Sequence, residues 1–177
     1  MIIKISKLII ISAFIASIIY GIFNSKEPVK KGIFQAPSGW TKKKSANDTK
    51  QTIQSFTYAP PANKDGSVLY HIESYTELSP NRLFKLSDLV DVISDQYKSE
   101  LSTTNLKVGK PYMSGDLKCQ NISLNMEINT DGKTEIKYLR TTIIDDHKRF
   151  YILNACSYEE DKQKLLDIVS KMLNSLS

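Results

Sequence analysis

Glycine, histidine and cysteine are scarce in this chain, and their scarcity argues against several classes of functional site. The 177 residues contain seven glycines, two histidines and two cysteines. Each glycine lies where a turn is expected, which disfavours a phosphate-cradling loop, and the histidines and cysteines are too few for a zinc cluster. The chain also lacks the Gly-x-Ser-x-Gly, Gly-x-Gly-x-x-Gly, Walker, Cys-x-x-Cys and His-Glu-x-x-His motifs. The sequence therefore predicts no catalytic residue, cofactor or metal ion, and it favours a protein that is not an enzyme.

The composition indicates a folded protein with no affinity for nucleic acid. Hydrophobic residues make up 41% of the chain and charged residues 24%, which excludes a disordered or fibrous protein. Of the 24 basic residues, three precede the first acid, so 21 remain against 19 acidic ones and the net charge falls from +5 to +2. Nucleic-acid binding needs a clustered basic face instead. The lysines at 42–44 form the one concentrated patch, which we interpret as a solvated loop or, alternatively, as a contact with anionic lipid headgroups.

Residues 1–23 are predicted to be a signal peptide or signal anchor. Lys4 and Lys7 precede an apolar stretch of 16 uncharged residues at 8–23. A secretory signal has an apolar core of roughly 7–15 residues, and a membrane span needs about 20. The stretch lies between these lengths, and its cleavage region, Ile-Tyr-Gly at 19–21, is poor. An uncleaved anchor, a removed signal peptide and a buried core helix are the three interpretations, of which the last is disfavoured because the stretch has no polar face.

The leader predicts a protein of the bacterial cell envelope. The lysines that follow the apolar core would permit a cytoplasmic body under the positive-inside rule, but the short leading tail carries two lysines of its own, which favours export. We therefore expect the body in the periplasm or on the periplasmic side of the inner membrane, with the membrane contacted through residues 8–23. Residues 24–31 are polar and contain Pro28, as expected for a linker, and residues 32–177 are expected to form a single domain.

Alternation of apolar and polar residues predicts most of the body to be antiparallel sheet. In the 117–128 stretch, Ile122, Leu124, Met126 and Ile128 share one face, which we assign to the core. The Asn-Thr-Asp-Gly sequence at 129–132 predicts a hairpin turn, and residues 145–148 predict a second. The expected strands cover residues 52–58, 68–75, 106–113, 117–128, 134–144 and 150–156.

Helical spacing predicts two helices. The first should run from 88 to about 101, capped by Ser87, with Leu89, Ile93 and Tyr97 facing the core. The second should begin at a capping box formed by Ser157 and Glu160. Its expected apolar stripe comprises Leu165, Leu166, Val169, Met172, Leu173 and Leu176. Strands, helix, strands and helix in that order indicate the α+β class, an antiparallel sheet flanked by helices that follows an N-terminal apolar helix.

Three short motifs and this element order resemble a known family. The motifs are Pro-Ser-Gly-Trp at 37–40, Tyr-Ile-Leu-Asn-Ala-Cys at 151–156 and Met-Leu-Asn-Ser-Leu at 172–176. Over residues 32–176 the chain resembles the Mog/PsbP-like fold, and within it the exported bacterial proteins of the DcrB-like type. The resemblance implies an α/β/α sandwich and an accessory or protein-binding role, with no shared catalytic residues. This chain lacks the lipid-attached cysteine of exported relatives, which argues against an outer-membrane lipoprotein.

Two groups of side chains are candidates for a site. Asp145, Asp146 and His147 are the densest set of potential metal ligands, but they fall at an expected hairpin turn, where aspartate is favoured for its turn geometry. His71 and Glu73 share a strand face and could serve as an acid and a base in a cleft. No third catalytic member or oxyanion donor accompanies His71 and Glu73, so we favour a structural or solvent-facing role for this pair and a turn role for residues 145–147.

We expect Cys119 and Cys156 to be free thiols and Trp40 to be structural. Turns centred near residue 131 and between 146 and 147 place Cys119 opposite about residue 143 and Cys156 roughly 20 Å away along the sheet. A disulfide requires Cα atoms within about 7 Å, so both thiols should be free. Tryptophan is enriched at interfaces, but after Pro-Ser-Gly we expect Trp40 to fold back on the sheet.

These expectations combine into a non-enzymatic envelope protein that binds another, unidentified protein through its sheet face or loops. A periplasmic immunity or inhibitor protein directed against a secreted effector is the first alternative. A weak hydrolase or metal enzyme that uses His71, Glu73 or the turn at 145–147 is the second.

Overall fold

A computed structural model describes residues 34–35, 37–44, 53–61, 70–77, 85–100, 103–130, 133–147 and 149–175. The predicted leader (1–23) and linker (24–31) lie outside these residues. The strands are β1 (Thr41–Lys44), β2 (Ile53–Ala59), β3 (Tyr70–Glu77), β4 (Thr103–Val108), β5 (Tyr112–Ser114), β6 (Leu117–Thr130), β7 (Lys133–Asp145) and β8 (Phe150–Tyr158). The helices are α2 (Leu86–Glu100) and α3 (Lys162–Asn174), with a 3-10 turn at Glu159–Asp161 before α3.

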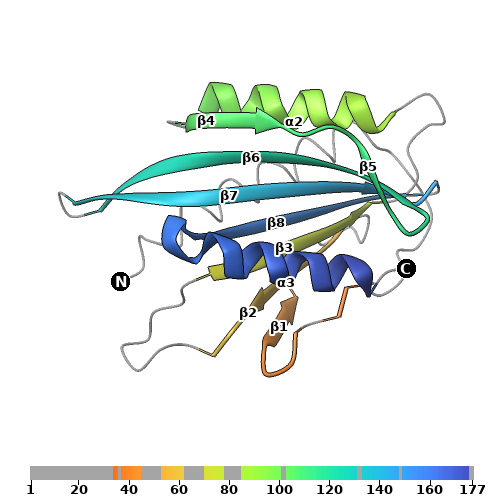
Figure 1. Ribbon diagram of the computed structural model, residues 1–177, viewed down its shortest axis with the longest axis horizontal. Helices are drawn as coiled ribbons and strands as arrows, with labels where there is room; N and C mark the ends of the chain where they lie inside the picture. The colour runs from red at the N-terminus through yellow and green to blue at the C-terminus, as the bar shows by residue number, and fades with distance from the viewer. Residues whose placement is uncertain are drawn as a thin grey trace.

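The described strands form one open antiparallel sheet. Its order is β1-β2-β3-β8-β7-β6-β4 (Figure 1). β5 pairs with the first residues of β6, which β4 does not reach. The long hairpin of β6 and β7 closes through Thr130 opposite Lys133, as the turn sequence predicts. β8 then returns beside β7 and receives β3 on its other edge. The antiparallel α+β prediction is therefore confirmed, while the predicted N-terminal helix falls outside the described residues.

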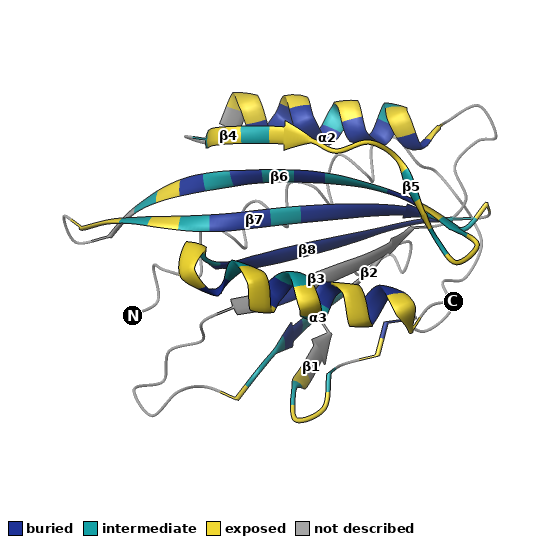
Figure 2. Ribbon diagram, in the orientation of Figure 1, coloured by how far each residue is buried: buried dark blue, intermediate teal, exposed yellow. Residues whose placement is uncertain are grey.

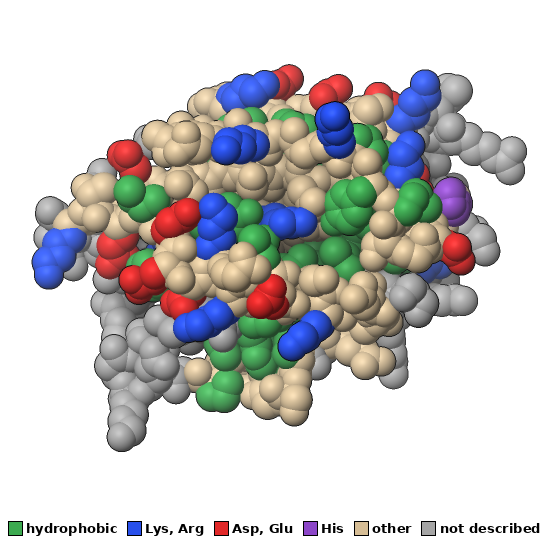
Figure 3. All heavy atoms as spheres, viewed as in Figure 1, with side chains coloured by type: hydrophobic (Ala, Val, Ile, Leu, Met, Phe, Trp, Pro, Cys, Tyr) green, Lys and Arg blue, Asp and Glu red, His purple; other side chains and the backbone are tan. Residues whose placement is uncertain are grey.

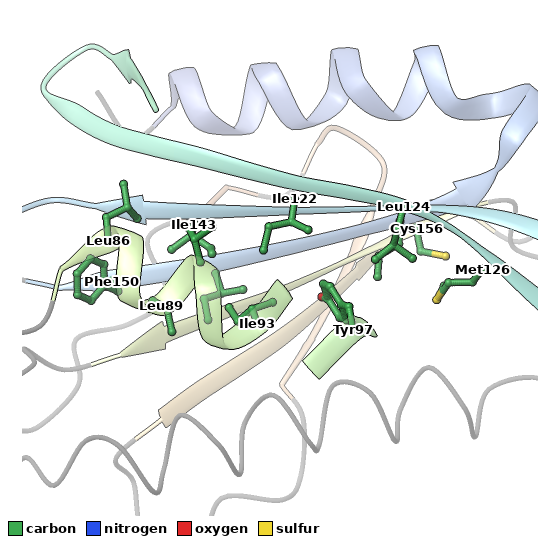
Figure 4. Packing of buried hydrophobic residues seen from close by; sticks show 13 residues of the cluster. Leu86, Leu89, Ile93, Tyr97, Ile122, Leu124, Met126, Ile143, Phe150 and Cys156 are labelled. Atoms are coloured by element: carbon green, nitrogen blue, oxygen red, sulfur yellow. The ribbon is translucent and has the colours of Figure 1, made fainter. Parts of the chain in front are cut away.

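The two helices lie on opposite faces of this sheet. α2 packs over β4, β6 and β7, and α3 packs over β8. Alternation along the strands separates the two cores, because neighbouring residues of a strand point to opposite faces. The α2 side holds the cluster Leu86, Leu89, Val90, Ile93, Tyr97, Ile122, Leu124, Met126, Leu139, Ile143, Phe150, Ile152 and Cys156, part of which Figure 4 shows. The α3 side holds Phe34, Tyr58, Ile72, Cys119, Tyr138, Ile144, Tyr151, Leu153, Ala155, Leu165, Val169, Met172 and Leu173.

The predicted apolar stripes are confirmed where the structure describes them, except that Ile128 is half-buried and belongs to neither core cluster. In α2 the side chains of Leu89, Ile93 and Tyr97 are buried, and in β6 those of Ile122 and Leu124 lie opposite them. Figure 2 shows β8 buried along almost its whole length, as expected for a central strand covered on both faces. In α3 the residues Leu165, Val169, Met172 and Leu173 are buried and Leu166 is half-buried. Neither α2 nor α3, the helices of the described residues, has the length and apolar character of a membrane span.

The start of α2 differs from the prediction. Ser87 lies in the first turn and not at the cap, because the helix begins at Leu86. Lys85 occupies the preceding position, and its backbone N–H donates a hydrogen bond to Asp88 Oδ2 at 2.9 Å. The carboxylate of Asp88 thus satisfies a backbone donor at the positive end of the helix dipole.

The predicted capping box of Ser157 and Glu160 is wrong. Ser157 lies inside β8, paired with Tyr138 and Tyr70, and its buried hydroxyl has no hydrogen-bond partner among the residues that the structure describes. α3 begins only at Lys162, and no side chain caps it or the 3-10 turn before it. Pairing with the strands on both sides extends β8 by two residues beyond the predicted end, which moves the start of the helix along the chain.

Two further boundaries are corrected. The predicted strand 106–113 is divided into β4 and β5, because Pro111 has no N–H for the ladder and Gly109 N–H bonds to Asn121 O at 2.8 Å. The lysines at 42–44 belong to β1, where Lys42 lies opposite Tyr58, whereas a loop is the sequence-based expectation. The edge strand β4 is irregular at Asn105, whose φ of 58° accompanies a shift in register.

Candidate functional site

The densest predicted cluster, Asp145 to His147, is a hairpin turn. Asp145 Oδ1 accepts the backbone N–H of His147 at 2.8 Å, and Asp146 Oδ1 accepts that of Arg149 at 2.6 Å. Asp146 Oδ2 accepts the hydroxyl of Tyr151 at 2.8 Å, and burial together with this bond raises the pKa of Tyr151 to about 12. Both carboxylates therefore hold the turn and its neighbouring strand. In the described part of the chain no three His, Cys, Asp or Glu side chains are grouped for a metal ion.

His71 and Glu73 lie in β3, away from that turn. Their register partners on β8 are Cys156 and Asn154, and Cys156 in turn lies opposite Leu139 on β7. Leu139 is six residues from Asp145 along β7, which is about 20 Å at the usual rise. The two sets of candidate residues are thus at different ends of the sheet, and the structure does not bring them together.

Neither Cys119 nor Cys156 forms a disulfide, and both are buried, which confirms the prediction of two thiols. Cys119 belongs to the cluster under α3 and Cys156 to the cluster under α2, so the two lie on opposite faces of the sheet. Cys119 is opposite Ile144 instead of residue 143, because the hairpin turns sit slightly further along the chain than expected. Burial raises the pKa of the Cys119 thiol to about 11.

Trp40 follows a tight turn and packs on the α3 side. Its backbone N–H bonds to Pro37 O at 3.1 Å, and Gly39 has a φ of 79°. A positive φ at the third residue is the signature of a type II turn, which explains the glycine. The partly buried Trp40 side chain contacts the cluster under α3, the position that a structural role requires.

A site that the sequence did not suggest lies on the sheet face beside α3. In Figure 1, β6 and β7 run alongside α3, whose main strand contacts are with β8. Figure 3 shows the surface hollowed along this edge of α3, with basic, acidic and apolar side chains around the hollow. We call it the Arg140 groove, with a floor of the half-buried residues Asn121, Ser123, Asn125 and Arg140.

Arg140 is the chemically distinctive member of the groove. It is half-buried in the middle of β7, between the buried residues Leu139 and Thr141. Its Nε is shielded from solvent without a hydrogen-bond partner, and no described residue supplies a carboxylate or another acceptor to its guanidinium. A guanidinium has five N–H donors and no acceptor. A partner's acceptor cannot reach the shielded Nε, so it would pair with the terminal N–H groups of this half-buried side chain.

The neighbours of Arg140 add further donors to the groove. Ser123 lies directly opposite Arg140 on β6, and Asn121 lies opposite Thr142. Asn121 Oδ1 accepts hydrogen bonds from Tyr112 Oη at 3.3 Å and Thr142 Oγ1 at 2.9 Å. Since its oxygen is engaged by two donors, the Asn121 side chain offers its amide N–H groups for any further contact. The floor is therefore matched to a ligand rich in acceptors.

Apolar side chains lie at the wall and at both ends of the groove, and the wall also carries Lys162. Lys162 Nζ lies 4.5 Å from the centroid of the Tyr138 ring, so the stripe of α3 that contains Lys162 and Leu166 faces β7. Leu166 is half-buried at this wall. Ile136, on the same face of β7 as Arg140, is 50% exposed at the end near the β6–β7 hairpin. Tyr112 and Leu117, both partly buried, lie toward the opposite end.

The sequence carried one signal for this site. Arg140 is a single charge in an otherwise uncharged run from Tyr138 to Ile144, but a strand that alternates between core and solvent accommodates such a residue without any function.

Comparisons with known proteins give little further identification. No family model matches the chain, and no curated protein matches it. Among solved structures, the crystal structure of LpqN, involved in cell envelope biogenesis of Mycobacterium tuberculosis, is similar with a TM-score of 0.40 and 13% sequence identity. The match covers 80% of this chain and 78% of LpqN. At this level the similarity identifies neither a fold family nor a function.

Proposed function

We propose that this chain is a non-enzymatic binding module of the bacterial cell envelope, and that it binds another protein through the Arg140 groove. The observation that carries the proposal is the half-buried Arg140 guanidinium, which has no acceptor among the described residues. A half-buried cation with no partner among the described residues gains no ion-pair energy within the fold. The Arg140 guanidinium is therefore available to bind an acceptor of a partner protein.

The surroundings of Arg140 favour binding over catalysis. Ser123 is the one hydroxyl directly opposite Arg140, and a nucleophilic serine requires a base within hydrogen-bond reach. The described residues that flank Ser123 on β6 are the amides Asn121 and Asn125, which cannot act as bases. The carboxylates at 145–146 are engaged in their turn. A donor-lined groove with apolar ends is instead typical of a surface that recognises a partner.

The fold supports the same role. A sheet with α2 on one face and α3 on the other is the layering that the Mog/PsbP-like resemblance implies, and that family consists mainly of accessory and binding proteins. The charged start and apolar stretch of residues 1–23 support placement in the envelope, with residues 8–23 in or through the membrane.

Site-specific photo-crosslinking in living cells tests the binding role. A photoreactive amino acid replaces Ser123 in the groove in one strain and Asp91, on the exposed side of α2, in the control. We expect a discrete protein adduct from position 123 that is absent from position 91. Loss of any adduct at 123, or identical adducts from both positions, would refute the proposed binding surface.

The location is tested independently. Alkaline phosphatase is fused after Lys31 and expressed in a bacterial host, where the enzyme is active only after export. Activity is expected for the exported body. An inactive, fully synthesised fusion would place the body in the cytoplasm and would end the envelope proposal.

A further inference from the structure

We infer that the Arg140 groove recognises an extended protein segment with an acidic side chain at its centre and apolar side chains at both ends. The inference rests on the proposed binding role and specifies the chemistry of the partner. It follows from the positions of the donors and of the apolar residues along β6 and β7.

The centre of the groove selects an oxyanion. Arg140 supplies a guanidinium, and Ser123 and Asn121 supply neutral donors on the adjacent strand. A carboxylate accepts hydrogen bonds at two oxygens, and arginine matches that geometry with two parallel N–H groups. Directly opposite side chains in an antiparallel pair lie about 5 Å apart at Cβ, so Ser123 and Arg140 can contact one carboxylate together.

The apolar ends define the spacing of the segment. Ile136 precedes Arg140 by four residues on β7, which is about 13 Å at the strand rise. Tyr112 pairs with Cys119, four residues from Ser123 in the opposite direction on β6. An extended peptide has the same rise as a strand. An acidic residue bound by Arg140 would therefore place apolar residues about four positions before and after it over Tyr112 and Ile136.

A protein segment fits this face better than an anionic membrane does. Attraction to lipid headgroups requires several clustered basic residues. The exposed residues of α3 alternate in sign, with Lys164, Asp167 and Lys171 on the same helix. Glu127 is exposed directly opposite Ile136 and would repel an anionic surface. Lys162 at the wall is ion-paired with Glu159 at 3.0 Å. Arg140 is therefore the described cation of the groove that remains for a single carboxylate.

Binding is measured with the full chain in detergent micelles and a defined peptide. The probe is a fluorescent, terminally blocked nine-residue peptide with leucine at both ends, glutamate at the centre and serine elsewhere. Its counterpart has glutamine at the centre. We expect the glutamate peptide to bind at least tenfold more tightly than the glutamine peptide. Arg140→Gln should weaken binding of the glutamate peptide by about ten- to hundredfold, the range for a hydrogen bond to a charged group.

Two matched variants separate geometry from charge. Arg140→Lys keeps the charge but loses the planar fork, so its affinity should lie between the original chain and Arg140→Gln. Lys118→Gln removes one charge from the exposed, α2-facing side of β6 and should leave binding unchanged. The thermal unfolding midpoint of each variant verifies that the fold is kept.

The outcomes distinguish this inference from the proposed function. Equal binding of both peptides, no effect of Arg140→Gln, or Arg140-dependent binding to phosphatidylglycerol vesicles without peptide binding would overturn acidic-segment recognition. If the adduct at position 123 nevertheless persists in cells carrying Arg140→Gln, the binding module stands and only its chemistry is wrong. Absence of that adduct in the original chain removes both.

Discussion

A chain of buried hydrogen bonds inside the apolar layer beneath α2 makes a quantitative prediction. Tyr97 Oη lies 2.6 Å from Thr141 Oγ1, and Thr141 Oγ1 lies 2.8 Å from Asn154 Oδ1. Asn154 Oδ1 can only accept, so the single hydroxyl hydrogen of Thr141 is donated to it. The Tyr97 hydroxyl must then be the donor to Thr141. All three residues are buried, so solvent cannot replace a lost partner.

The substitution Thr141→Val removes both bonds while conserving the shape of the side chain. Asn154 Oδ1 loses its donor and Tyr97 loses its acceptor at Thr141. Each such loss in a buried site costs about 1–2 kcal/mol, so we expect the free energy of unfolding to fall by about 2–4 kcal/mol. The neighbouring Thr142→Val is the matched control. It removes one bond to Asn121, which keeps its second donor Tyr112, and should cost about 1 kcal/mol.

Urea unfolding of the original chain and both variants, followed by far-ultraviolet circular dichroism, measures these differences. A double-mutant cycle with Tyr97→Phe adds the coupling, and Thr141→Val should cost about 1 kcal/mol less in that background. The reasoning is refuted if Thr141→Val destabilises the protein no more than Thr142→Val does. Additive effects of Thr141→Val and Tyr97→Phe would refute the assigned hydrogen-bond chain.

Three further predictions follow from burial. Ser157→Ala should leave the unfolding free energy unchanged or raise it by about 1 kcal/mol, because the hydroxyl is buried without a partner; a loss of about 1 kcal/mol would instead support the capping box. Trp40→Ala should lower that free energy by about 1–3 kcal/mol, and an unchanged melting temperature would contradict its contact with the core. The pKa of Cys119 is raised from 9.0 to about 11, so its neutral thiol stabilises the fold below pH 9 and this contribution is lost as the pH rises toward 11. Cys119→Ala should reduce the loss of unfolding free energy between pH 9 and 11. An unchanged dependence of that free energy on pH would contradict the assigned role of the Cys119 thiol.

Periodicity predicted the elements and their inward faces because it is a local property of the chain. Alternation assigned Ile122, Leu124 and Met126 to the core, and helical spacing assigned Leu89 and Ile93 to the stripe that meets them. Both assignments depend only on how side chains project from a strand or a helix. The hairpins were equally local, because their turn residues lie in one short stretch.

The ends of elements were less predictable because tertiary contacts decide them. Ser157 and Glu160 have the spacing of a capping box, but pairing of β8 with β3 and β7 keeps Ser157 extended. The choice depends on strands that are distant in sequence. The order β1-β2-β3-β8 likewise requires β3 to pair with β8, which lies about 80 residues further along the chain, and no local pattern encodes that pairing.

The Arg140 groove could not be predicted for the same reason. A lone arginine in an alternating strand is typical of a solvent-facing position. Its significance arises only when β6 places donors opposite it, α3 forms the neighbouring wall, and no carboxylate of the described residues pairs with it. Each of these facts concerns the surroundings of the residue and not the residue itself.

The opposite placement of the two sulfur atoms has a consequence for biogenesis. Since the sheet itself separates Cys119 from Cys156, no oxidation within one molecule can cross-link the native domain. Maturation then needs no thiol oxidase or disulfide isomerase, and reductant should leave the mature protein intact. The domain can reach the same native state on either side of a membrane, whatever the redox poise it meets there.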